Sequence, residues 1–147
     1  MNVRIVVADS RQANFFDADK PGGPWAQRGS LHNETAGMKD TDLETDREGR
    51  RFGGTAGHHH GVDGERSTER HELTNFAREV AQNIEAARVA HEFDRLVIVA
   101  GPRMIGLLRE ELPQPCRAVL AAEVVKDLPA QDAAAIREAV PREVFWN

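Results

Sequence analysis

Glycine gathers in one stretch of the sequence, where it could serve chemistry that needs a close backbone approach. Residues 47–66 hold six of the chain's twelve glycines, and Gly53 and Gly54 stand directly before Thr55. Glycine adopts positive φ at little steric cost and lets a backbone lie close to a ligand. Neither the GxGxxG nor the GxxxxGK[ST] nucleotide-binding pattern occurs here. The sequence therefore indicates a candidate functional loop at 47–66 rather than a nucleotide cradle.

The same loop carries arginines that could contact nucleic-acid phosphate. They are Arg47, Arg50, Arg51 and Arg66, and they form a local basic patch on a chain with a net charge of −5. That overall charge argues against strong nucleic-acid binding outside this patch. Aromatic residues make up only 5% of the chain, so few rings are available to stack on bases. A solvated loop without a ligand is the alternative interpretation.

Three consecutive histidines, His58, His59 and His60, raise the question of a metal site. Neighbouring side chains diverge in an extended chain, so adjacent histidines are poor ligands for one ion. The sequence has a single cysteine, Cys116, and no paired-cysteine or HExxH spacing. A solvated loop tip is favoured over a metal site, and no cofactor is predicted. We expect Cys116 to be a structural thiol.

Aspartates at the ends of expected strands suggest a third possibility, a metal-dependent nuclease. Asp9 ends the first expected strand, whereas Asp94 begins a later one, and Asp17 and Asp127 have no clear place. A turn or cap role is favoured for each of the four carboxylates.

Hydrophobic periodicity predicts the elements that must position these residues. We expect strands at 3–8, 13–18, 25–33, 94–100 and 117–125, and helices at 67–91, 102–112 and 130–139. The unbroken apolar run at 96–99 predicts an interior strand covered on both faces. This order predicts a single α/β domain over 1–147, with a mixed sheet and helices on its faces.

The expected cellular location follows from the absence of a membrane-spanning stretch and of a signal-peptide pattern in the sequence. No stretch approaches the ~20 apolar residues that span a bilayer, and the first residues do not resemble a signal peptide. We expect a cytoplasmic protein without a membrane partner.

The order of these segments resembles the bacterial host attachment family. The resemblance rests on a VxVADxxxAxxF-like start over 6–16, the polar stretch 42–52, and the segments 69–88, 93–112 and 124–138. That family is related to archaeal and eukaryotic peptide-release factors. The resemblance implies the ribonuclease H-like fold of the middle domain of release factors and of Pelota, with a ribosome or tRNA as partner.

In release factors the matching loop ends in Gly-Gly-Gln and enters the peptidyl-transferase centre. Here the matching place reads Gly53-Gly54-Thr55. The threonine hydroxyl cannot offer the geometry of a glutamine amide, so peptidyl-tRNA hydrolysis does not follow from the resemblance. We therefore consider two functions, a translation-associated factor that presents this loop to RNA, and a non-enzymatic regulatory or scaffolding protein with an indirect role in host attachment.

Overall fold

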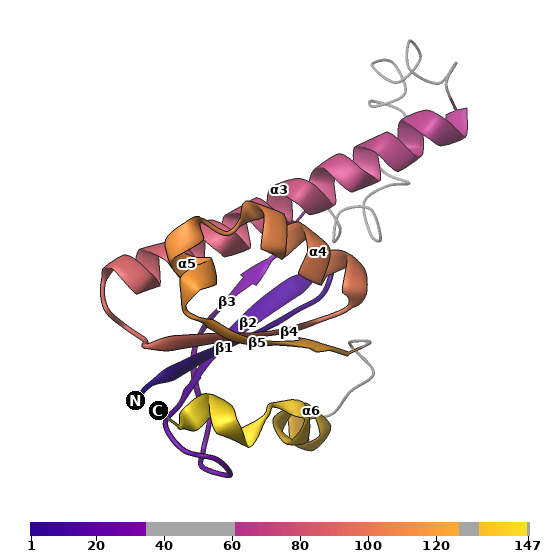
Figure 1. Ribbon diagram of the computed structural model, residues 1–147. Coiled ribbons are helices and arrows are strands. Elements are labelled where there is room, and N and C mark those ends of the chain that lie inside the picture. The colour runs from indigo at the N-terminus through magenta and orange to yellow at the C-terminus, as the bar shows by residue number, and fades with distance from the viewer. Residues whose placement is uncertain (35–60, 127–132, 147) are drawn as a thin grey trace.

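The computed structural model describes residues 1–34, 61–126 and 133–146, with the backbone alone for residues 61–70. Five strands form one sheet in the order β3-β2-β1-β4-β5 (Figure 1). The elements are β1 (Val3–Ala8), β2 (Gln12–Ala18), β3 (Ala26–His32), α3 (Gly61–Val89), β4 (Arg95–Ala100), α4 (Pro102–Glu111), α5 (Gln114–Ala118), β5 (Leu120–Val125), α6 (Ala133–Ala139) and the 3-10 helix η2 (Arg142–Phe145).

The sheet is mixed, as the order of elements predicted. β1 pairs antiparallel with β2 and parallel with β4, while β4 pairs parallel with β5. β2 also pairs antiparallel with β3, which forms one edge of the sheet. The β-branched residues of β1 and β4 suit these central positions, and the predicted burial of Leu96, Val97, Ile98 and Val99 is confirmed.

Helices α3, α4 and α5 cover one face of the sheet (Figure 1). The apolar face of α3 meets the sheet through Phe76, Val80 and Ile84, all at most 2% exposed. These residues recur at helical spacing and pack against Phe15 and Ile98 from the strands. This cluster is the main core of the protein, and its contribution from α3 is as the sequence predicted.

The opposite face is covered by α6 and η2 (Figure 1). Val140 and Val144 are buried there against Val3, Ile5 and Val97 of the sheet. Because side chains alternate between the faces of a strand, β1 and β4 supply apolar residues to both clusters. Both central strands are therefore covered on each side.

Several element boundaries differ from the predicted ones. Helix α3 begins at Gly61, six residues before the predicted start, so residues 61–66 are helical rather than part of the loop predicted at 47–66. The short helix α5 was not predicted; its last two residues fall in the strand predicted at 117–125, and β5 begins only at Leu120. Pro113 occupies the N-cap position of α5 and a second proline lies in its first turn, where the missing N–H costs no helical hydrogen bond.

A buried ion pair joins the strands beneath the end of α3. The Arg4 side chain on β1 donates from Nε to Oδ1 of Asp17 at 2.5 Å, and the two side chains are only 3% and 7% exposed. Nη2 of Arg4 also reaches Glu92 at 3.1 Å, and Arg28 on β3 donates to Asp17 at 2.9 Å. The guanidinium lies over the Phe93 ring, 5.4 Å from its centroid. The predicted turn or cap role for Asp17 was therefore wrong.

The thiol of Cys116 is buried, as expected of a structural cysteine. It donates to Glu85 Oε1 at 3.1 Å. Burial of the Cys116 thiol is the largest cause that raises its pKa from 9.0 to about 12, and the neighbouring Glu85 carboxylate is the second. Only about one thiol in ten thousand is then ionised at pH 8, and the thiolate is the reactive form.

We predict that native protein resists alkylation by iodoacetamide at pH 8, whereas protein unfolded in guanidinium reacts like a free cysteine. Mass spectrometry after timed quenching measures both rates. Equal rates in the native and unfolded states would contradict the buried, hydrogen-bonded thiol.

Candidate functional site

The parallel strands β1, β4 and β5 end at the same side of the sheet, here called the carboxyl edge. Ala8 pairs with Ala100, and Ala100 pairs with Val125, so the three strand ends are in register. In open α/β sheets, ligands bind outside the carboxyl ends of the strands. Residues that directly follow these ends, Asp9 and Lys126 among them, are therefore candidates for function.

The turn after β1 is fixed by the Asp9 carboxylate. Its Oδ1 accepts hydrogen bonds from the backbone N–H groups of Arg11 at 2.7 Å and Gln12 at 2.8 Å. The Asp9 N–H donates to the Gln12 carbonyl at 2.9 Å, which closes the turn. The predicted turn role of Asp9 is confirmed, and these bonds order the backbone at the carboxyl edge.

The end of β3 is tied to the same turn. The Asn33 N–H donates to the Arg11 carbonyl at 2.7 Å, and Asn33 Nδ2 donates to the Ser10 carbonyl at 2.9 Å. Residues 35–60 follow this anchored point along the chain. The segment that contains most of the predicted site therefore leaves the domain at the carboxyl edge.

After residue 60 the chain is described again from the start of helix α3. This helix projects past the sheet on the side of the carboxyl edge (Figure 1). Among its described side chains, the first buried one is Leu73, twelve residues after Gly61. At 1.5 Å per residue, that distance along the helix is about 18 Å. The described residues on either side of segment 35–60 thus lie on one side of the molecule.

Most of the predicted site residues lie between residues 34 and 61 in the sequence. Gly53, Gly54 and Thr55, the histidines His58–His60, and Arg47, Arg50 and Arg51 lie outside the described residues. Arg66 lies in helix α3 rather than in a loop. The described residues that flank segment 35–60 both lie on the side of the carboxyl edge, which sequence reasoning did not foresee.

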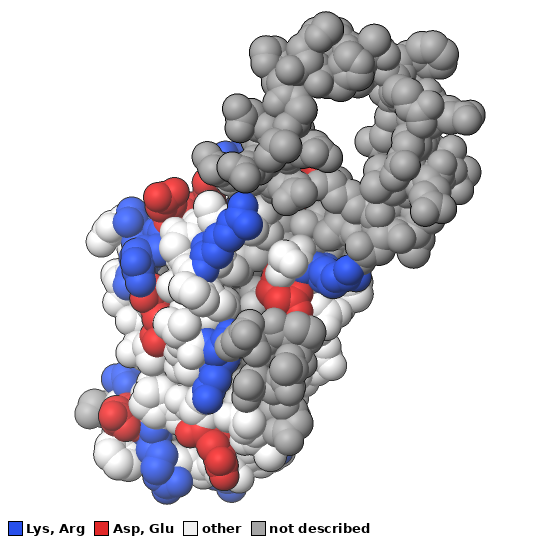
Figure 2. Space-filling view, turned by 90° about the vertical axis from the view of Figure 1, so that its right-hand side faces the viewer, with Lys and Arg blue, Asp and Glu red and all other residues white. Residues whose placement is uncertain are grey.

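Basic residues that sequence reasoning missed also lie at the carboxyl edge. Arg11 belongs to the turn after β1, Arg103 stands in the first turn of α4, and Lys126 follows β5. The first turn of α4 has no acidic residue, so its free N–H groups and helix dipole favour an anion. Figure 2 views the molecule from this side and shows groups of Lys and Arg with Asp and Glu between them. Sequence reasoning could have identified these residues because each of them follows closely after the end of a predicted strand.

A metal-dependent nuclease site on paired Asp9 and Asp94 is ruled out by the topology. Asp94 precedes β4 at the opposite edge of the sheet, where its Oδ2 accepts the Asn2 N–H at 2.7 Å. Across residues 1–34, 61–126 and 133–146, no group of three His, Cys, Asp or Glu side chains could hold a metal ion. Asp127 lies outside the described residues.

Solved structures show that this fold is found elsewhere. The chain is similar to the crystal structure of an archaeal translation termination factor, with a TM-score of 0.53 and 12% identity. The match covers 98% of this chain and 36% of that one. At this identity the likeness shows the fold alone, and it confirms the predicted resemblance to release factors.

No helix in the described part of the chain is long and apolar enough to cross a bilayer.

Sequence comparisons give the family. An uncharacterized protein of Rickettsia prowazekii (strain Madrid E) is 32% identical over 66 residues, which make up 44% of this chain and 44% of that protein. The model of a family described as "Protein required for attachment to host cells" matches residues 4–140. Because this match spans most of the sequence, the chain belongs to that family of host attachment proteins.

Proposed function

We propose that this protein is a translation-associated factor that places residues 47–66 against ribosomal RNA or tRNA. Its arginines, Arg47, Arg50, Arg51 and Arg66, contact phosphate in this proposal, and Gly53 and Gly54 allow the backbone to approach the RNA. Of these four residues, Arg66 lies within helix α3.

The observation that carries this proposal is the common anchoring of the segment. Asn33 ties the end of β3 to the turn after β1, and α3 projects on the same side (Figure 1). Arg103 is exposed at that side, near the uncapped N-terminus of α4. Basic groups on the side from which both flanks of segment 35–60 extend suit contact with a large polyanion. The similarity in fold to an archaeal translation termination factor also supports a role in translation.

Peptidyl-tRNA hydrolysis is not part of the proposal. Thr55 follows the paired glycines at the place where a release factor has glutamine, and a hydroxyl cannot replace the amide. The proposed role is therefore binding. The alternative is a non-enzymatic regulatory or scaffolding protein that shares only the fold and affects host attachment indirectly.

Replacing two arginines tests the RNA contact. We predict that the variant Arg50→Gln/Arg51→Gln binds purified ribosomes more weakly than wild type in co-sedimentation. Each lost phosphate contact should make the plot of log affinity against log salt shallower by roughly one unit, so the slope changes by roughly 1–2 units.

A matched control is provided by Lys20→Gln/Arg117→Gln, which removes the same charge from the opposite edge of the sheet. Both side chains are exposed, and we expect the ribosome affinity and its salt slope to stay close to wild type. Equal weakening by the two variants would indicate a general charge effect. Absence of ribosome binding by the wild type would favour the scaffolding alternative.

A further inference from the structure

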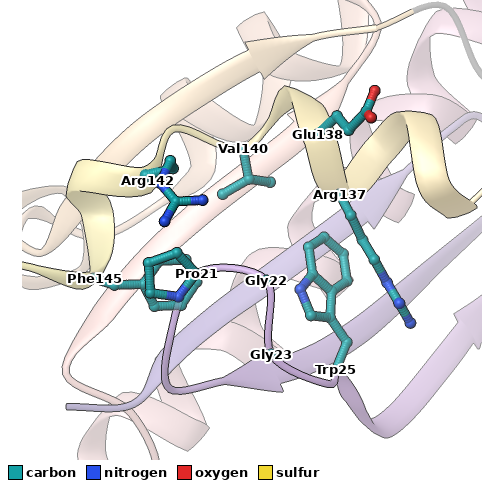
Figure 3. Close-up of a pocket in the computed structure, with 9 residues that line it drawn as sticks. All are labelled: Pro21, Gly22, Gly23, Trp25, Arg137, Glu138, Val140, Arg142 and Phe145. Carbon is teal, nitrogen blue, oxygen red and sulfur yellow. The ribbon is translucent and has the colours of Figure 1, made fainter.

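A cavity of about 280 Å³ opens on the face of the sheet covered by α6 and η2, away from the carboxyl edge. The turn between β2 and β3 forms one wall through Pro21, Gly22 and Gly23, and Trp25 follows on the same segment. The end of α6, Val140 and η2 form the other wall (Figure 3). Residues more than a hundred positions apart in the sequence therefore line one site.

The turn wall is held in a single backbone geometry. The Gly23 N–H donates to the Lys20 carbonyl at 3.1 Å, and Gly22 has a φ of +73°, which favours glycine. A methyl group at Gly23 would lie 2.7 Å from Lys20 Cγ, so a side chain there would force the lysine to move. This turn shapes the cavity before any ligand arrives.

Trp25 is fixed in orientation by its neighbours. Its ring lies 5.5 Å from the ring of Phe16, and the Arg137 guanidinium lies 5.6 Å from the indole centroid. Figure 3 shows the indole nitrogen on the side of the ring that faces the cavity. Trp25 therefore offers a positioned N–H donor to a ligand.

Arg142 supplies the positive charge of the cavity. Its guanidinium points toward the glycine turn, below Val140, whereas the Glu138 carboxylate points away (Figure 3). Within the described part of the chain, neither the Arg142 guanidinium nor the Trp25 indole N–H has a hydrogen-bond partner. Two donors are thus available at the cavity.

Three further side chains of the lining are apolar. Val140 is 6% exposed, and Pro21 and Phe145 line the cavity on the side opposite Trp25 (Figure 3). Such walls suit a ring or short hydrocarbon body. The Arg137 guanidinium lies on the far side of Trp25 (Figure 3), so the Arg142 guanidinium and one indole N–H face the cavity, and these two groups suit a monoanion.

We propose that this cavity binds a small organic carboxylate with an apolar body. The carboxylate accepts hydrogen bonds from Arg142 and from Trp25 Nε1, and the body lies against Val140, Pro21 and Phe145. The site is separate from the proposed RNA contact, because its turn between β2 and β3 lies at the edge of the sheet opposite to the carboxyl edge.

The indole N–H signal of Trp25 in a proton–nitrogen correlation spectrum tests the proposal directly. The chain has two tryptophans, and Trp146→Phe assigns the signals. We use 3-phenylpropanoate as the probe, its neutral amide to test the charge, and acetate to test the apolar body. We expect a saturable shift of the Trp25 signal with 3-phenylpropanoate, and binding weaker by about tenfold or more for the amide and for acetate.

Arg142→Gln should also weaken 3-phenylpropanoate binding by about tenfold or more, because the charged hydrogen bonds are lost. The matched control Arg117→Gln removes an exposed arginine on α5, outside the cavity, and should bind as wild type. Equal affinity for acid and amide, an unchanged affinity in Arg142→Gln, or a Trp25 signal that does not move would each overturn the proposal. Acetate binding as tightly as 3-phenylpropanoate would overturn the role of the apolar walls.

Discussion

Replacing Asp17 with asparagine should lower the free energy of unfolding by about 3–5 kcal/mol, the cost of leaving a buried charge without its partner. The Arg4 guanidinium is only 3% exposed and loses the carboxylate that lies 2.5 Å away. Glu92 remains as a second partner, but its side chain is 53% exposed and cannot replace the buried contact. Urea denaturation followed by circular dichroism measures the change.

The matched control is Asp19→Asn, which removes an exposed carboxylate two residues along the chain. We expect a change within about 0.5 kcal/mol there. Replacing both members of the pair, as Arg4→Met/Asp17→Leu, should restore much of the stability, because no buried charge is left. A single Asp17→Asn variant as stable as the control would contradict the importance of the pair.

The same pair makes a prediction about pH. Burial alone would raise the pKa of Asp17, but the hydrogen bonds from Arg4 outweigh it and hold the pKa below the ordinary value of 3.8. A depressed pKa in the folded state contributes stability that is present above 3.8 and is lost as the pH falls through the lower folded value. The difference in stability between wild type and Asp17→Asn should therefore be constant near neutral pH and shrink below about pH 4. A difference that grows in acid would contradict this assignment.

Ile98→Ala should lower the free energy of unfolding by about 2–5 kcal/mol, because it opens a cavity in the main core. Ile98 lies on β4, is 1% exposed, and packs beneath α3. Neighbouring elements hold the strand on both sides, so the site has little freedom to collapse.

The control for Ile98→Ala is Val125→Ala on the neighbouring strand, where the side chain is 59% exposed. We expect that change to cost less than about 1 kcal/mol. If thermal unfolding showed the same midpoint shift for both variants, β4 would not be the centre of the core.

Hydrophobic periodicity in the sequence correctly predicted several strands and helices together with their buried faces. The apolar runs at 3–8 and 95–100 and the helical spacing of Phe76, Val80 and Ile84 each specify an element and its buried face. The start of α3 was missed because Gly61 and Gly64 are poor helix formers. Once the packed part of α3 has formed, each further residue adds one backbone hydrogen bond, so the helix can extend through these glycines.

Features made by long-range register could not be read from the sequence. Arg4 lies opposite Asp17 only because β1 and β2 pair in that register, and nothing in either strand alone shows the pairing. Arg142 and Trp25 line one cavity although they are far apart along the chain. The carboxyl edge likewise depends on which strands run parallel, which a single sequence leaves open.

The central claim, that residues 47–66 lie against RNA, is tested most directly by cleavage from a tethered probe. Cys116 is buried and its thiol pKa is about 12, so a maleimide iron chelate should label only a cysteine introduced by Thr55→Cys. Arg117→Cys places the same probe on α5, away from the carboxyl edge. On purified ribosomes, hydroxyl radicals from the Thr55 position should cut ribosomal RNA or tRNA at defined nucleotides, with little cutting from position 117. Cleavage of the same nucleotides with equal strength from both positions, or none from position 55, would contradict the account.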